Sequence, residues 1–229
     1  MRKFDYSYLA DRTWDNEIIS YISKIHEYKG KQELFLRQKP VELNRLIEIA
    51  TIQSFWFSSD TIIIEMTHLK NKKIIDQVRE RISDIDEYIE HLLHRSYTIG
   101  SMVIFPVHNN SMNQRKGTNP RIADRWDLTL ECIRRHYAGE ESPLSNVIES
   151  DKAFYDLFVD FKGYVDFFFM QDCVSEDYSS VDIWIGDASF KENGLPKTVE
   201  DYFKFLVKEH IFLDKRNRRI QEYCIEHRI

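Results

Sequence analysis

The sequence predicts an α+β fold in which helices dominate and a small sheet of about three strands completes the domain. Several stretches carry apolar residues at spacings of three and four, which is typical of helices with one buried face. A few shorter stretches are rich in β-branched and aromatic residues, which favours strands. Seven Gly and five Pro in 229 residues are too few for the many turns of a β-sandwich.

Two domains are expected, with a boundary where the composition changes from polar helix to aromatic strand. Residues 1–54 are predicted to form a helical hairpin, with Thr13 capping the first helix and Pro40 in the first turn of the second. Residues 55–229 are predicted to form a helix-dominated α+β domain with a small sheet, which begins with a turn and a strand.

Within the second domain, strands and helices are predicted from their periodicity. Strands are expected in "SFWFSSDTIIIEM" (54–66), "YTIGSMVIFP" (97–106) and "VDIWI" (181–185). Helices are expected at 74–92, 120–138, 154–168 and from Thr198 onward. The last of these helices begins acidic and reaches the basic stretch Lys215–Arg219, which would complement a helix dipole.

The totals argue against several classes of protein. A net charge of −6 gives no overall attraction to nucleic acid or to an acidic membrane, so nucleic-acid binding is not expected. The uncharged run Ser96–Gln114 is too polar to cross a membrane, and the first residues lack an apolar signal region, so we expect a cytoplasmic protein. Residues 138–203 carry fifteen acidic against four basic side chains, which could pair with another part of the fold or face a partner.

Metal and cofactor sites are not expected. The three cysteines are far apart and no CxxC occurs, which argues against a disulfide framework and a structural zinc site. Glu87, His91 and His94 share a predicted helix face, but the pattern is not HExxH and a solvated face is the favoured interpretation. No P-loop, GxSxG or GxGxxG motif is present, so the sequence does not decide whether the protein is an enzyme.

The candidate site is the stretch "NPRIADRWDLTLECIRRHY" (119–137), predicted to be a helix that starts at Pro120. Its apolar residues fall on one stripe around Trp126, which predicts a core-facing side. The favoured interpretation is a solvated helix with ion pairs from Glu131 to the following arginines, and with Arg125 and Asp127 pointing outward.

A second interpretation makes the preceding loop and the helix start a site for a phosphate or carboxylate ligand. Asp124 and Asp127 would orient the arginines or bind a metal, and a partner-protein interface is the third interpretation. The residues expected at such a site are Asn113, Arg115, Asn119, Arg121, Asp124 and Arg125.

The first fifty-odd residues resemble the helical N-terminal region of Fic-type proteins, many of which transfer AMP from ATP to a hydroxyl group. The resemblance is carried by "FDYSYL" (4–9), "IISYISKIHEYKGKQELFLRQKP" (18–40) and "LIEIATIQS" (46–54). The family's catalytic His-Pro-Phe and Gly-Asn-Gly pieces are missing here, so no AMP transfer is expected and no Fic site residue is carried over.

From about Phe55, the chain resembles a different, uncharacterised bacterial family with no established activity. Its marks are "TIGSMVIFP" (98–106), "NQRKGTNPRIADRWDLTLECIRRHY" (113–137), "SPL" (142–144) and "DFKGYVDFFFMQD" (160–172). The combination predicts a non-catalytic, intracellular bacterial binding or regulatory protein, in a toxin–antitoxin or stress setting. The alternative is an enzyme that acts on an anionic ligand at Asn113–Asp127.

Overall fold

The structure is a computed structural model, and it describes a helical body with short segments that precede it in the chain. The described residues are 52–56, 76–77, 80, 99–106, 121–123 and 125–226. The predicted hairpin of residues 1–54 lies outside them except for its last positions, and so does most of the predicted helix over 74–92.

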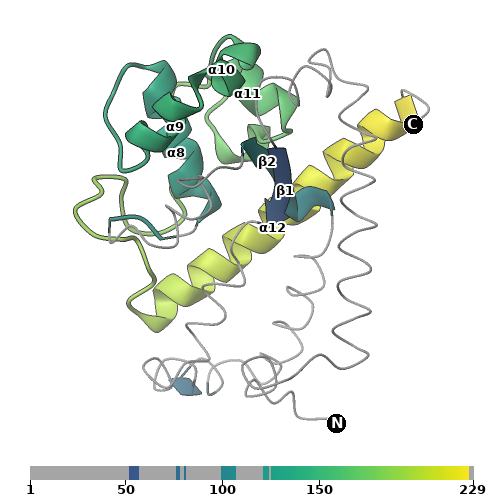
Figure 1. Cartoon of the computed structure of the whole chain (residues 1–229). Helices are drawn as coiled ribbons and strands as arrows, with labels where there is room; N and C mark the ends of the chain where they lie inside the picture. Colours follow the sequence, from purple (N-terminus) through teal and green to yellow (C-terminus); the bar gives the residue numbers. More distant parts are fainter. Residues whose placement is uncertain are drawn as a thin grey trace, which may run out of the picture.

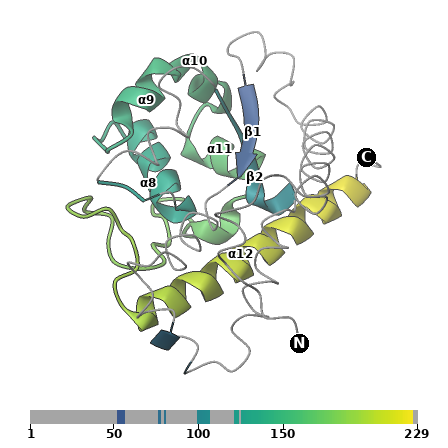
Figure 2. The ribbon, with the colours of Figure 1, turned by 60° about the horizontal axis from the view of Figure 1, so that its bottom comes forward.

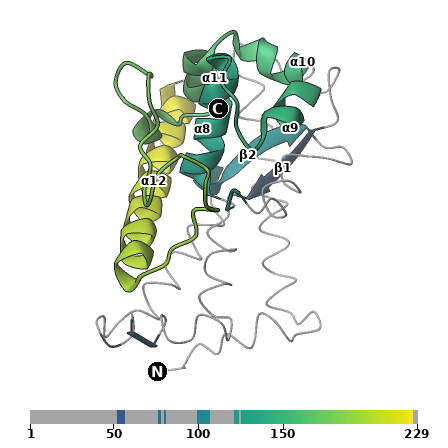
Figure 3. The same ribbon diagram turned by 90° about the vertical axis from the view of Figure 1, so that its left-hand side faces the viewer.

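Helices make up most of the described body. Its elements in chain order are β1 (Ile52–Trp56), η2 (Ile99–Ser101), β2 (Met102–Pro106), α8 (Trp126–Tyr137), α9 (Ser145–Ser150), α10 (Lys152–Tyr155), η3 (Asp156–Phe158), α11 (Phe161–Phe167), η4 (Gln171–Cys173) and α12 (Val199–Glu226). The short helices α8 to α11 gather on one side of the long helix α12, and the β1–β2 pair lies beside them (Figures 1 and 3).

The expected α+β class is wrong, because the described body is helical and has no sheet of the expected size. β1 pairs with β2 in an antiparallel ladder that sets Ile52 opposite Pro106, and no third strand joins them within the described residues. The predicted strand over 181–185 is irregular and takes part in one isolated bridge, between Val174 and Val181.

The backbone around Trp184 explains why no strand forms there. The carboxylate of Asp127 accepts a hydrogen bond from the Trp184 backbone N–H at 2.8 Å. The guanidinium of Arg125 donates to the Ile185 carbonyl oxygen at 3.1 Å. Since side chains satisfy these backbone groups, a neighbouring strand cannot pair with them.

Helix α12 begins at a capping box, as the sequence predicted for Thr198. The Thr198 Oγ1 accepts from the Asp201 N–H at 3.1 Å, and the Asp201 carboxylate accepts from the Thr198 N–H at 3.2 Å. The helix has 28 residues, about 42 Å at the usual rise. It continues to Glu226, so Lys215–Arg219 lies inside the helix and the expected basic C-terminus is wrong.

Arg216 on α12 joins three other parts of the body. It donates to the carbonyl oxygens of Phe168 at 2.8 Å and Gly100 at 2.5 Å, and its guanidinium lies 5.1 Å from the centre of the Trp126 ring. The neighbouring Asn217 accepts from the Gly100 N–H at 2.8 Å. Burial lowers the pKa of Arg216 to about 9, so the side chain stays charged at neutral pH.

Part of the acidic excess of residues 138–203 is paired with basic residues of α12. Asp182 contacts Lys208 at 2.7 Å, and Asp172 contacts Arg219 at 2.6 Å and Lys215 at 3.4 Å. These two acidic residues therefore serve contacts within the fold.

The single helix expected over 154–168 is wrong, because the chain breaks between η3 and α11. Val159 has a φ of 72°, a conformation that a β-branched residue rarely adopts and that cannot continue a helix. Asp160 then caps α11 by accepting from the Gly163 N–H at 2.7 Å. A Cβ at Gly163 would lie 2.0 Å from the Phe158 carbonyl oxygen, so only glycine fits this break.

Helix α8 begins at Trp126, later than the predicted start at Pro120. Arg125 is extended, with φ −131° and ψ 140°, and the Ala123 N–H donates to the Asn193 carbonyl oxygen at 2.5 Å. This tertiary contact holds the preceding residues out of the helix. The predicted apolar stripe is confirmed as core at these positions: Ile122, Trp126, Leu130 and Ile133.

Candidate functional site

The N-terminal end of α8 carries an ion pair that is closed to solvent. Arg125 and Asp127 both have side chains that are 0% exposed. Arg125 donates through Nε to Asp127 Oδ1 at 3.0 Å and through a second nitrogen to Oδ2, which gives a two-pronged contact. The expectation that these two side chains point outward is therefore wrong.

Arg125 also holds two points of an irregular segment before α12. Its Nη1 donates to the Gly194 carbonyl oxygen at 2.5 Å, and its Nη2 donates to the Ile185 carbonyl oxygen at 3.1 Å. Gly194 has a φ of +81°, and a Cβ there would lie 2.6 Å from the Leu128 side chain and 3.1 Å from Arg125 Nη1. A residue larger than glycine does not fit between the segment and α8.

Two further arginines hold the middle of the same segment. Arg121 donates to the Phe190 carbonyl oxygen at 3.2 Å, and Arg135 donates to the Ala188 carbonyl oxygen at 2.7 Å. The Arg135 guanidinium also lies over the Phe190 ring, 4.8 Å from its centre. Phe190 is buried with a φ of 55°, an unusual backbone conformation that these contacts stabilise.

We call Arg121, Arg125 and Arg135 the arginine clamp, and residues 184–197 the clamped loop. The clamped loop contains no helix or strand, although it follows and precedes regular elements. It lies alongside the N-terminal ends of α8 and α12, as Figures 1 and 2 show for the light-green segment before α12. The arginine clamp thus fixes a long irregular loop onto the helical body.

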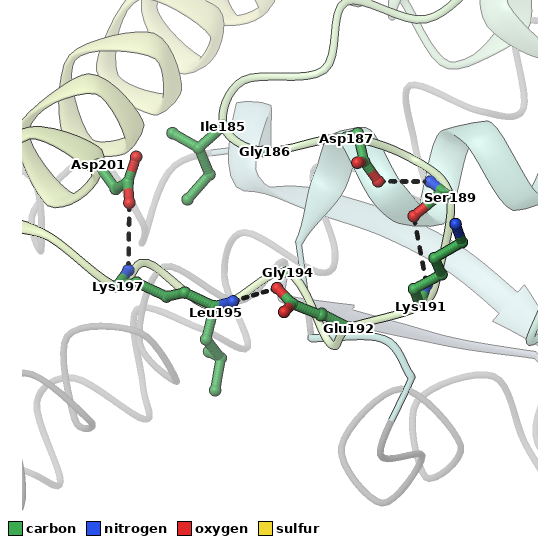
Figure 4. Close-up of a pocket in the computed structure, with 10 residues that line it drawn as sticks. All are labelled: Ile185, Gly186, Asp187, Ser189, Lys191, Glu192, Gly194, Leu195, Lys197 and Asp201. Carbon is green, nitrogen blue, oxygen red and sulfur yellow. Dashed lines mark hydrogen bonds and ion pairs between the residues drawn. The ribbon is translucent and has the colours of Figure 1, made fainter.

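The clamped loop and the start of α12 line a cavity of about 390 Å³ that is open to solvent. Most of the residues that line it are polar or charged, with both signs of charge, beside the apolar Ile185 and Leu195 (Figure 4). The lining residues are Ile185, Gly186, Asp187, Ser189, Lys191, Glu192, Gly194, Leu195, Lys197 and Asp201. The size is at the small end of the range for ligand sites, and the lining favours a polar ligand.

Most charged groups of the cavity already have partners. Lys197 forms an ion pair with Glu192. Hydrogen bonds from the Ser189 side chain and from its backbone N–H, the latter at 2.7 Å, lower the pKa of Asp187 below its ordinary value. Asp201 accepts from the N–H groups of the α12 cap described above. Lys191 is exposed, and no carboxylate among the described residues lies within ion-pair distance of its ammonium, although its charge helps to lower the pKa of Asp187.

The structure describes two of the six residues expected at a ligand site, Arg121 and Arg125. Both contact the clamped loop, so the structure brings them to one place, but Arg125 serves the fold there. The other expected residues lie outside the described part of the chain: Asn113, Arg115, Asn119 and Asp124.

Sequence reasoning missed the clamped loop and Arg135 as parts of one site. The signal available was weak: the stretch before Thr198 lacks helical periodicity and contains two glycines, Gly186 and Gly194. Asp127 was expected to orient an arginine in one interpretation, and it does so. The expected ion pairs from Glu131 to Arg134 and Arg135 are confirmed, each at 2.8 Å.

The buried thiols do not offer a nucleophile. Cys132 and Cys173 are both 0% exposed. Burial raises the pKa of Cys132 to about 12 and also raises that of Cys173, so both stay protonated at neutral pH.

The described residues hold neither a metal-binding cluster nor a membrane span. No group of three His, Cys, Asp or Glu side chains comes together there as a metal site, and the set Glu87, His91 and His94 lies outside them. None of the described helices has the length and apolar character needed to cross a bilayer.

The body and its cavity define a helical protein with a fixed polar loop and no recognised catalytic arrangement in the described part. The sequence model of a family described as "Family of unknown function (DUF6994)" matches residues 22–220. The chain therefore belongs to a family of unknown function, and the match begins at residue 22, within the stretch that resembled Fic-type proteins. No curated protein and no solved structure matches the chain, and the resemblance of residues 1–54 to Fic-type proteins has no support in these comparisons.

Proposed function

We propose that this chain is a non-catalytic binding protein whose ligand contacts the clamped loop and its cavity. The observation that carries the proposal is the arginine clamp, in which three arginines donate to four carbonyl oxygens of one loop. Loops that a rigid scaffold positions are where proteins place their binding groups.

The energetics of Arg125 and Asp127 support this proposal. Taking two charges out of water costs several kcal/mol per ion, and apolar side chains of similar size often stabilise a fold equally well. An ion pair that also fixes the backbone at Ile185 and Gly194 provides what apolar packing does not, a defined loop conformation. The positive φ of Phe190 fits the same interpretation, since unusual backbone conformations cluster at ligand sites.

The alternative is an enzyme that binds an anion at Asn113–Asp127. One residue of that expected site, Arg125, does not fit this role. The Nε, Nη1 and Nη2 atoms of Arg125 all donate to groups of the fold, so this arginine is not available to an anion. The cytoplasmic, bacterial setting stays part of the proposal and rests on the sequence alone. The toxin–antitoxin setting depended on the Fic resemblance, and the proposal does not include it.

The test uses ¹⁵N NMR spectra of the full chain. The probes are inorganic phosphate, acetate, methylammonium, glucose and the common amino acids. We expect at least one probe to shift the amide signals of Gly186 and Gly194 in a saturable way. The signal of Gly139, which follows α8, is the internal control and should not move.

Two variants make this test specific for the clamped loop. Arg135→Met removes the contacts to Ala188 and Phe190 and should weaken binding. Arg134→Met is the matched control, because Arg134 contacts Glu131 and Glu140 and should bind as the parent does. If no probe shifts the two loop glycines, or if both variants bind like the parent, the proposal is wrong.

A further inference from the structure

We infer that the cavity of the clamped loop binds the oxyanion group of a small ligand, a phosphate or a carboxylate, through Lys191. This inference rests on the proposed function and names the ligand class of the same site. The site differs from the one expected at Asn113–Asp127, because its cation and its backbone donors come from the chain just before α12.

Lys191 is the positive group that the cavity offers to a ligand. Its side chain is exposed, and no carboxylate contacts its ammonium within the described part of the chain. The other lysine of the lining, Lys197, is already neutralised by Glu192 (Figure 4). An ammonium on a flexible stem is a common binding group for phosphate and carboxylate.

Two carboxylates of the cavity accept hydrogen bonds from nearby backbone N–H groups. Asp187 accepts from the backbone N–H of Ser189 at 2.7 Å, and Asp201 accepts from those of Lys197 and Thr198 at 3.3 and 3.2 Å. Hydrogen bonds of this kind offset part of a carboxylate's negative charge. The repulsion that these groups exert on an incoming anion is reduced accordingly.

The backbone adds donors at the same place. Gly186 and Gly194 have φ values of +65° and +81°. Within the described residues, no acceptor contacts the backbone N–H groups of Gly186, Asp187 or Gly194. Successive free N–H groups around a left-handed residue are a known arrangement for anion binding. The positive end of the α12 dipole lies at the cavity as well, since Asp201, in the first turn of α12, is one of the lining residues.

The cavity volume indicates a ligand larger than a bare ion. A space of about 390 Å³ exceeds the volume of one phosphate group and can hold the polar remainder of a small molecule. The paired Lys197–Glu192 side chains and the Ser189 hydroxyl would face that remainder.

The experiment compares four probes by ¹⁵N NMR at constant ionic strength. Inorganic phosphate and acetate carry the oxyanion, while methylammonium and glucose do not. We expect phosphate or acetate to shift Gly186 and Gly194 with a dissociation constant on the order of 1 mM or tighter, and Gly139 to stay in place. Which of the two binds tighter distinguishes a phosphate ligand from a carboxylate ligand.

Lys191→Met should weaken this binding about tenfold, the loss expected when a hydrogen bond from a charged group is removed. Lys162→Met is the matched control, because Lys162 pairs with Asp166 on α11 and does not line the cavity. Unchanged binding by Lys191→Met, or no shift with either oxyanion, overturns the inference. Shifts caused by methylammonium or glucose alone would also overturn it, while the proposed binding function would stand.

Discussion

The two ends of α8 carry the same kinds of charged residues in opposite environments. At the N-terminal end, Arg125 and Asp127 are 0% exposed and contact the backbone of the clamped loop. At the C-terminal end, Arg134 and Glu140 have side chains that are 17% and 51% exposed. The two arginines are nine positions apart in one charged stretch.

The difference teaches that an ion pair's role depends on what covers it. The clamped loop covers the first turn of α8 and removes water from the Arg125 pair, while the last turn stays at the surface. A buried ion pair holds the backbone firmly and is costly to break, whereas a solvent-exposed ion pair contributes little to stability. Variants along the helix can therefore rank the pairs, from the buried end to the exposed end.

The largest effect is expected at the buried end. Arg125→Ala should lower the free energy of unfolding by ~3–5 kcal/mol, because it leaves the Asp127 carboxylate buried without its cation. Trp126→Ala should cost a similar ~3–5 kcal/mol by removing a ring packed 5.0 Å from Phe212. Chemical denaturation of both variants at one pH measures these changes.

A double variant separates the stranded charge from other causes. Arg125→Met with Asp127→Leu replaces the whole pair by apolar side chains and should recover part of the lost stability. If Arg125→Ala lowers the free energy of unfolding by less than ~1 kcal/mol, the buried pair is as weak as a surface ion pair, and the contrast between the two ends of α8 is wrong.

A smaller effect is expected at Arg135, which is partly exposed and contacts both Glu131 and the clamped loop. Arg135→Met removes the hydrogen bond to Ala188 and the contact with the Phe190 ring, and should cost about 1–2 kcal/mol. Amide hydrogen exchange should become faster over the clamped loop and stay unchanged in α12. Equal exchange in the parent and the variant would show that Arg135 does not hold the loop.

The ion pair between Asp172 and Arg219 is expected to have an intermediate effect on stability, and this effect should depend on pH. Burial acts to raise its pKa, but the hydrogen bond and charge of Arg219 outweigh burial, and the pKa lies below the ordinary 3.8. A lowered pKa in the folded state stabilises the protein above pH 3.8, and this stabilisation is lost as the pH falls through the folded-state pKa. Asp172→Asn should therefore cost about 1 kcal/mol at neutral pH and lose less stability on acidification. Parallel unfolding curves from neutral to acid pH test this, and identical acid slopes would contradict it.

The smallest effect is expected at the exposed end of α8. Glu140→Gln removes the contact to Arg134 at 2.9 Å, but Arg134 keeps its bond to Glu131 and water solvates the exposed carboxamide. Denaturation should give the same midpoint as for the parent at physiological salt. A clear loss of stability would mean that the surface network holds the helix more strongly than its exposure indicates.

Several features were predictable from the sequence because their causes are local. The stripe around Trp126, the cap at Thr198 and the pairs of Glu131 depend on residues one to four positions apart, and the structure confirms them. Spacing along one element is enough to place such contacts, because a helix brings those positions together whatever surrounds it.

The sequence by itself determined the apolar stripe around Trp126, the capped start of α12 and the absence of the Fic catalytic motif. Only the tertiary structure decided that Arg125 is buried, that residues 181–185 form no strand, and that a polar cavity lies before α12. Arg125 contacts Gly194, 69 positions away, and Asp127 contacts Trp184, 57 positions away. Whether a charged side chain meets water or another backbone depends on such distant segments, and periodicity along a single helix carries no information about them.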